Sequence, residues 1–204
     1  MKQINWNLYK DIFPNRYIKE GYFDNVIDFI IKSNNSISTI LDIGGGNGTN
    51  VLKKIDRLKI VDLLDPYVKK QEWMGKNINW DHKVNRKYDL AIARGSINYL
   101  TKKQIKSIPN LANKFLANSF ANSPSTTLSS RRYETIHLQR GVEFFIYRPE
   151  SRTVEHMLSP DRDEMIKHSF FYYSIKDYSE MLNGVKIIYY NQNSILLYWE
   201  NTNV

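Results

Sequence analysis

The chain of 204 residues contains no cysteine. Disulfide bonds, zinc sites built on thiolates and catalysis by a thiol are therefore excluded. Long apolar runs are also absent: no segment approaches the roughly 20 apolar residues that span a membrane. The start, Met1–Trp6, lacks the apolar core of a signal peptide. We therefore expect a cytoplasmic protein with no membrane partner, folded as one domain over residues 1–204.

Acidic residues are fewer than basic ones. The chain has 21 Asp and Glu against 29 Lys and Arg, a formal net charge of +8. This excess favours a solvated basic surface, because the lysines are spread over many segments and not gathered in one block. An RNA-binding face is the alternative. The lysines that show this spread are Lys53, Lys54, Lys59, Lys69, Lys70, Lys83, Lys87, Lys102, Lys103 and Lys106.

Glycine is scarce, yet four of the nine glycines stand between positions 44 and 48, in Asp42-Ile43-Gly44-Gly45-Gly46-Asn47-Gly48. The apolar run 39–43 before them predicts a strand, and the pattern after them predicts a helix that begins near residues 47–49. Glycines let the backbone turn sharply and let a ligand approach, while the free N–H groups of the helix point toward the loop. The segment therefore indicates a nucleotide-cofactor loop.

Two common nucleotide loops do not fit this segment. A phosphate-binding P-loop needs a lysine after its last glycine, but Thr49 follows Gly48. A dinucleotide loop needs its third glycine at position 47, where asparagine stands. The remaining pattern, acid-x-Gly-x-Gly-x-Gly, resembles motif I of the class I S-adenosylmethionine (SAM) dependent methyltransferases. The resemblance implies SAM as cofactor, with Asp42 facing the ammonium of its tail through water, and with a binding loop made of Gly44, Gly45, Gly46 and Gly48.

A second acidic position lies one βα unit later. The strand-like run 58–65 ends in Asp65, from where a carboxylate reaches both ribose hydroxyls of a nucleoside. Pro66 then stops the strand, because proline cannot donate to a β-ladder. Asp62 competes for the same role, although its place inside the strand makes it the weaker candidate.

The resemblance implies an α/β fold with a doubly wound, mostly parallel sheet of seven strands. A C-terminal antiparallel hairpin and a cap over the strand ends complete it. We expect strands at 39–43, 58–65, 78–80, 88–94 and 115–120, and a hairpin from 185–190 and 194–199. Helices are expected at 22–32, 49–57, 67–75, after Thr101 as N-cap, and at 174–182, where Gly184 follows as a stop.

Further cofactor contacts follow from the resemblance. A polar residue after the third strand often accepts a hydrogen bond from the adenine amino group, which points to Asp81 with Trp80 or His82 beside the ring. The expected cofactor set is completed by Pro66 after the second strand, Arg94 at the end of the strand 88–94, and Tyr17 of the N-terminal segment.

Two segments are available to hold a substrate: the N-terminal segment 1–32, with aromatic residues and a helix, and an insertion at 121–173. Alternating apolar residues in the second half of the insertion predict an antiparallel ribbon over the cofactor. A base is needed only where the acceptor loses a proton, and we assign His156 and Tyr133 as catalytic candidates. The substrate-binding candidates are Arg131, Arg132, Tyr99 and His168. Arg131 and Arg132 suit an anionic group of the acceptor, and the alternative is that these two arginines lie in a solvated loop. No metal site is expected.

The segment 94–99 narrows the acceptor class. DNA enzymes that methylate amino groups carry Pro-Pro at this place, and enzymes that methylate pyrimidine C5 need a cysteine, so neither class fits. We therefore expect O- or N-methylation of a small molecule. Three alternatives stay open: an RNA or protein methyltransferase, an enzyme that cleaves SAM or transfers its aminocarboxypropyl arm and releases methylthioadenosine, and a regulator that binds SAM without turnover.

Overall fold

The computed structural model describes residues 21–46, 49–66, 72–120, 134–138, 141–148, 153–161, 164–190 and 194–201, with the backbone alone at 120, 134–169, 190 and 194. The chain divides into two compact units. The larger contains residues 20–121 and 175–204, and the smaller contains residues 1–19 and 122–174. The expectation of a single domain over the whole chain stays a prediction.

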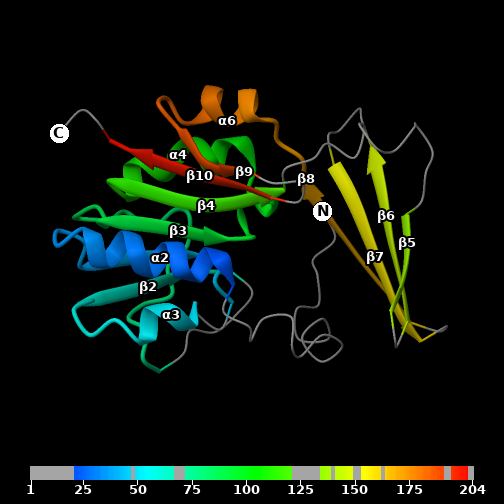
Figure 1. Ribbon diagram of the computed structural model, residues 1–204, viewed down its shortest axis with the longest axis horizontal. Helices are drawn as coiled ribbons and strands as arrows, with labels where there is room; N and C mark the ends of the chain where they lie inside the picture. The colour runs from blue at the N-terminus through cyan, green and yellow to red at the C-terminus, as the bar shows by residue number, and fades with distance from the viewer. Residues whose placement is uncertain are drawn as a thin grey trace. The chain divides into compact units, whose positions relative to one another are not determined.

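A six-stranded sheet forms the centre of the larger unit (Figure 1), in the order β2-β1-β3-β4-β10-β9. The first four strands in this order run parallel, and β10 runs antiparallel to both β4 and β9. The C-terminal hairpin is therefore confirmed. The strands are β1 (Thr39–Ile43), β2 (Ile60–Leu64), β3 (Leu90–Arg94), β4 (Lys114–Phe120), β9 (Lys186–Tyr190) and β10 (Ser194–Glu200).

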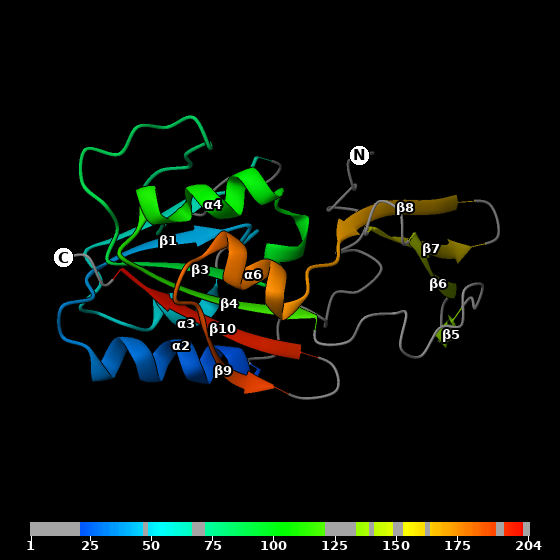
Figure 2. The same ribbon diagram turned by 90° about the horizontal axis from the view of Figure 1, so that it is seen from above.

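Helices cover both faces of this sheet, as Figures 1 and 2 show. On one face lie α2 (Tyr22–Ser33) and α3 (Asn50–Lys53), and on the other lie α4 (Lys102–Leu111) and α6 (Ile175–Met181). Ile27 of α2 packs in one apolar cluster with Ile40 of β1 and Ile92 of β3, all fully buried. The predicted cap of α4 is confirmed, because the Thr101 side chain accepts a hydrogen bond from the backbone of Gln104.

The expected strand at 78–80 is not formed, so the sheet has six described strands and not seven. One parallel bridge joins Asn77 to Leu63 of β2, with Leu63 N 2.8 Å from Lys76 O and Ile78 N 2.8 Å from Leu63 O. The chain then turns away, since His82 N bonds to Asn79 O. Because residues 79–82 form a turn, the bridge at Asn77 does not continue into a strand. In the expected helix 67–75, residues 72–75 are not helical, with a turn at 72–73, and residues 67–71 lie outside the described residues.

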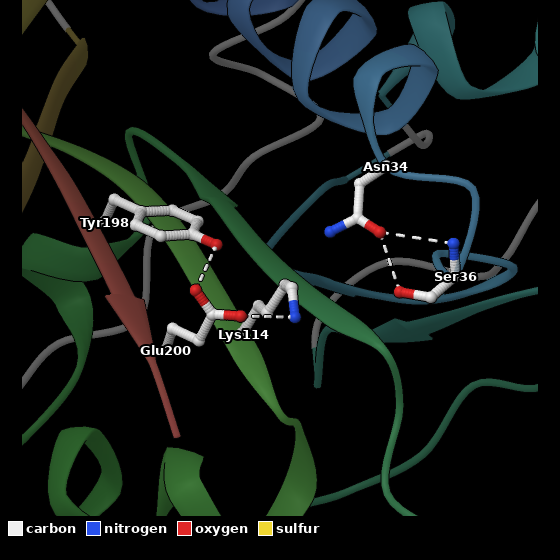
Figure 3. A network of polar contacts seen from close by, with 5 residues as sticks. All are labelled: Asn34, Ser36, Lys114, Tyr198 and Glu200. Atoms are coloured by element: carbon white, nitrogen blue, oxygen red, sulfur yellow. Dashed lines mark hydrogen bonds and ion pairs between the residues drawn. The ribbon is translucent and has the colours of Figure 1, made fainter. Parts of the chain in front are cut away.

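Polar contacts at the amino ends of the parallel strands hold the sheet and its connections (Figure 3). Glu200 of β10 accepts from Lys114 Nζ of β4 at 2.6 Å and from Tyr198 Oη at 3.2 Å. The pKa of Glu200 is lowered by Lys114, whereas burial, followed by the charge of Glu200, raises the pKa of Tyr198 to about 12. In the loop before β1, Asn34 Oδ1 accepts from the backbone and hydroxyl of Ser36.

The smaller unit contains a four-stranded antiparallel sheet in the order β5-β6-β7-β8. Its strands are β5 (Glu134–Leu138), β6 (Gly141–Arg148), β7 (Thr153–Asp161) and β8 (Glu164–Phe171). These strands form where alternating residues predicted an antiparallel ribbon, and the placement of that ribbon over the cofactor stays a prediction. Across the ranges that the structure describes, no helix is long and apolar enough to cross a membrane.

Candidate cofactor site

At the carboxyl ends of the parallel strands, the residues that follow β1 and β3 form hydrogen bonds with the neighbouring strands. Gly44 N donates to Leu64 O of β2 at 2.9 Å, and the Ser96 hydroxyl after β3 donates to Ile43 O of β1. Gly95 N donates to the side chain of Asn118 in β4. Ligands of open α/β sheets bind outside the carboxyl ends of the strands, so this edge is the candidate cofactor site.

The glycine loop needs glycine for both conformation and space. Gly44 and Gly46 have φ of 65° and 62°, a left-handed conformation that disfavours side chains. A Cβ on Gly44 would lie 2.5 Å from Ser96 Cβ, and a Cβ on Gly45 would lie 2.1 Å from Asp42 Oδ2. The loop backbone therefore packs directly against these two side chains. Gly48 lies outside the described residues.

Asp42 connects the end of β1 to the start of α3. It is fully buried, and its Oδ2 accepts from the backbone N–H of Thr49, the N-cap of α3, at 2.9 Å. Burial is the main cause that raises its pKa to about 6, against the hydrogen bonding of Thr49. Within the described residues its second oxygen, Oδ1, has no hydrogen-bond partner. The carboxylate holds the glycine loop closed, and contact with the cofactor stays a prediction.

Asp65 lies beside the glycine loop. It follows β2, is 7% exposed, and accepts from Gly46 N at 3.1 Å. Asn77 Nδ2 holds its backbone by donating to Asp65 O at 3.1 Å. The competing acid, Asp62, instead accepts from the Tyr88 hydroxyl at 2.6 Å and from Lys76 N. The two acids that the sequence favoured, Asp42 and Asp65, therefore both contact the glycine loop. Asp62 is instead engaged by Tyr88 and Lys76.

Arg94 at the end of β3 forms an ion pair that the sequence did not predict. Its Nη2 lies 2.7 Å from Oδ2 of Asp24, in the first turn of α2. The same Asp24 oxygen accepts from Gly21 N at 2.8 Å and caps the helix. An acid in the first turn was the local signal for this cap, but nothing local pointed from Asp24 to Arg94.

The other candidates are dispersed or lie outside the described residues. Tyr99 is half-buried in the 3₁₀ turn η1 (Ile97–Tyr99), which follows Ser96. Asp81 and His82 are exposed, and Trp80 is half-buried. Pro66 is exposed beside Asp65. The backbone register of β7 and β8 places His156 opposite His168. No group of metal-ligating side chains occurs in the described part of the chain. The candidates outside it are Tyr17, Arg131, Arg132 and Tyr133.

Comparisons with known proteins give a likeness in structure and none in sequence. No protein-family model matches the chain, and no curated protein sequence matches it. A SAM-dependent methyltransferase from Clostridium acetobutylicum is 14% identical, with 96% of this chain and 97% of that chain covered and a TM-score of 0.65. For CalS10, a SAM-bound amino pentose methyltransferase from Micromonospora echinaspora, the identity is 11%, the coverage 97% and 99%, and the TM-score 0.62.

A third similar structure is the sugar N-methyltransferase KedS8 from a Streptoalloteichus species. It is 12% identical, with 98% of this chain and 94% of that chain covered and a TM-score of 0.62. At such identities the likeness shows the fold. The resemblance drawn from the glycine loop is thereby confirmed at that level: the chain has the Rossmann-like fold of the class I SAM-dependent methyltransferases.

Proposed function

We propose that this protein is a SAM-dependent methyltransferase that methylates an oxygen or nitrogen atom of a small molecule. The observation that carries the proposal is the Gly44–Gly46 loop, fixed by Asp42 below it and by Asp65 beside it. This arrangement lies at the carboxyl edge of the parallel strands, where the fold binds ligands.

The residues present fit the cofactor. Asp65 supplies two acceptor oxygens for the two hydroxyls of a ribose, and it already contacts the loop through Gly46 N. Asp42 keeps a buried carboxylate oxygen without a donor among the described residues, which suits a cationic ligand group, reached through water. When bound, SAM supplies a methyl group on a sulfonium with a good leaving group. The protein then chiefly has to bind and align the two substrates.

The small-molecule acceptor is supported by the similar structures and by the smaller unit. Two of those structures are sugar methyltransferases, and their chains match this one over nearly its full length. In the sequence, residues 122–174 of the smaller unit follow β4 and precede α6, and we propose that this segment forms a cap over the acceptor. In this proposal His156, opposite His168, accepts a proton where the acceptor must lose one, with Tyr133 as a second catalytic candidate. Arg131 and Arg132 bind an anionic group of the acceptor.

The cofactor part of the proposal is tested by calorimetric titration with SAM. Asp65→Ala should weaken SAM binding by about 1–3 kcal/mol, because ribose hydroxyls lose their acceptor. Asp56→Ala, which removes an exposed carboxylate after α3, is the matched control and should bind as the wild type does. Unchanged affinity in Asp65→Ala would remove Asp65 from the site.

The reaction is tested by incubation with SAM and a panel of amino sugars, with products identified by mass. Methyl transfer predicts S-adenosylhomocysteine together with an acceptor heavier by one methylene. Methylthioadenosine would contradict methyl transfer and indicate cleavage of SAM or transfer of its arm. Transfer to RNA, with binding that weakens steeply as salt rises, would contradict the small-molecule acceptor.

A further inference from the structure

Three charged side chains gather on the face of the sheet that α2 covers. Asp42 pairs with Ile92 in the register of β1 and β3, so both side chains lie on one face. Arg94 stands two residues beyond Ile92 on the same strand, and its side chain is therefore on that face as well, nearer the carboxyl edge. Asp24 reaches this group from the first turn of α2 through its ion pair with Arg94.

The buried oxygens of this group are incompletely satisfied by the described residues. Asp24 is only 2% exposed and Asp42 is fully buried, yet Oδ1 of each has no hydrogen-bond partner there. A buried carboxylate oxygen without a donor costs free energy, so in native proteins such an oxygen is usually satisfied by a water, an ion or a ligand. Two of them at one edge of the sheet, beside a cofactor loop, indicate a ligand that brings donors.

The charges also define what kind of ligand group fits. Asp24 and Asp42 favour a cation, while the planar guanidinium of Arg94, 27% exposed, matches a carboxylate in bidentate geometry. The positive charge of Arg94 also acts on Asp42, whose pKa it lowers against the effect of burial. An ammonium and a carboxylate on one carbon, as in an α-amino acid, would complement both signs at once.

We propose that the Arg94–Asp24 pair recognises the amino-acid tail of the cofactor, with Arg94 binding the tail carboxylate and Asp24 positioning the guanidinium. This inference rests on the proposed function, because it assigns a role within the same SAM site. It makes Arg94 a specificity-determining residue that distinguishes SAM from nucleosides without a charged tail. Asp24 is a positioning residue that acts through Arg94.

The test uses three probes that differ only in the tail: S-adenosylhomocysteine, its decarboxylated analogue, and methylthioadenosine, which lacks the aminocarboxypropyl arm. Wild-type protein should bind S-adenosylhomocysteine at least about 10-fold more tightly than the decarboxylated analogue. In Arg94→Gln this ratio should fall to about one, while the affinity for methylthioadenosine changes less than about 2-fold. Asp24→Asn should reduce the ratio partly. Arg86→Gln, at an exposed arginine before the amino end of β3, should keep the wild-type ratio.

The outcomes separate this inference from the proposed function. If the wild type binds none of the three probes, the proposed function fails and takes the inference with it. If the wild type binds them but Arg94→Gln keeps the wild-type ratio, or weakens all three equally, the pair is only structural and the inference is overturned. Should Arg94→Gln fail to fold, Arg94→Lys allows the same comparison, because it keeps the charge but loses the bidentate geometry.

Discussion

Alanine at position 45 is a direct perturbation of the cofactor loop. The Cβ of Gly45→Ala would lie 2.1 Å from Asp42 Oδ2 and 2.2 Å from its Cγ. Atoms cannot approach so closely, so either the Asp42 carboxylate or the loop must move. Moving the carboxylate breaks its hydrogen bond with Thr49 N, and moving the loop breaks the bond between Gly46 N and Asp65.

The expected cost combines two effects. Overpacking of a close-packed site costs about 1–3 kcal/mol. Loss of a hydrogen bond to a charged group adds about 1.5–3 kcal/mol. If the cofactor binds only the intact loop, affinity for SAM should fall by about 2.5–6 kcal/mol, which is roughly 60-fold or more.

Calorimetric titration with SAM, together with thermal unfolding, measures this effect. Gly184→Ala is the matched control, since Gly184 has φ of 78° but nothing lies within 4 Å of an added Cβ. The control should lose about 1–2 kcal/mol of stability from backbone strain and keep its SAM affinity. Wild-type affinity in Gly45→Ala, or an equal loss in Gly184→Ala, would refute the account of the loop.

Two further predictions concern stability. Asp42 has a folded pKa of about 6 against a usual 3.8, so its contribution is present at low pH and lost as pH rises through 6, a cost of about 3 kcal/mol. The stability of Asp42→Asn relative to the wild type, measured by urea unfolding, should therefore increase as pH rises from about 4 to about 6 and stay constant above about pH 7. A difference that does not change between about pH 4 and 7 would contradict this. Tyr178→Phe should lose about 1–2 kcal/mol, because it leaves the buried Ser119 hydroxyl without the partner now 2.7 Å away. A second substitution, Ser119→Ala, should restore part of that loss in a double-mutant cycle.

The sequence predicted those parts of the fold that depend on local patterns. The strand β1 covers the predicted residues, because a strand buried on both faces appears as a continuous apolar run. The helix α3 is shorter than the predicted 49–57 and ends at Lys53. Leu52 and Ile55 are both buried, but the chain beyond Lys53 forms successive tight turns, such as the one closed by the hydrogen bond from Leu58 N to Ile55 O. Apolar periodicity predicts which residues are buried and not how their backbones bond.

The sequence also predicted those parts of the candidate site that depend on local patterns. Asp42 lies near the end of β1 and Asp65 follows β2, each within a recognisable pattern, and the structure connects both to the glycine loop. The Arg94–Asp24 ion pair joins residues 70 positions apart, and only the packing of α2 on β3 brings them together. Ser96 was equally hidden, because its contact with Ile43 depends on the pairing of β1 and β3.

A crystal structure of the protein with S-adenosylhomocysteine would show whether the Gly44–Gly46 loop and Asp65 form a SAM site. We expect the ribose hydroxyls within hydrogen-bond distance of the Asp65 carboxylate and the amino-acid tail beside the glycine loop. A nucleoside bound elsewhere, or no bound nucleoside at saturating concentration, would show that these residues do not form the site.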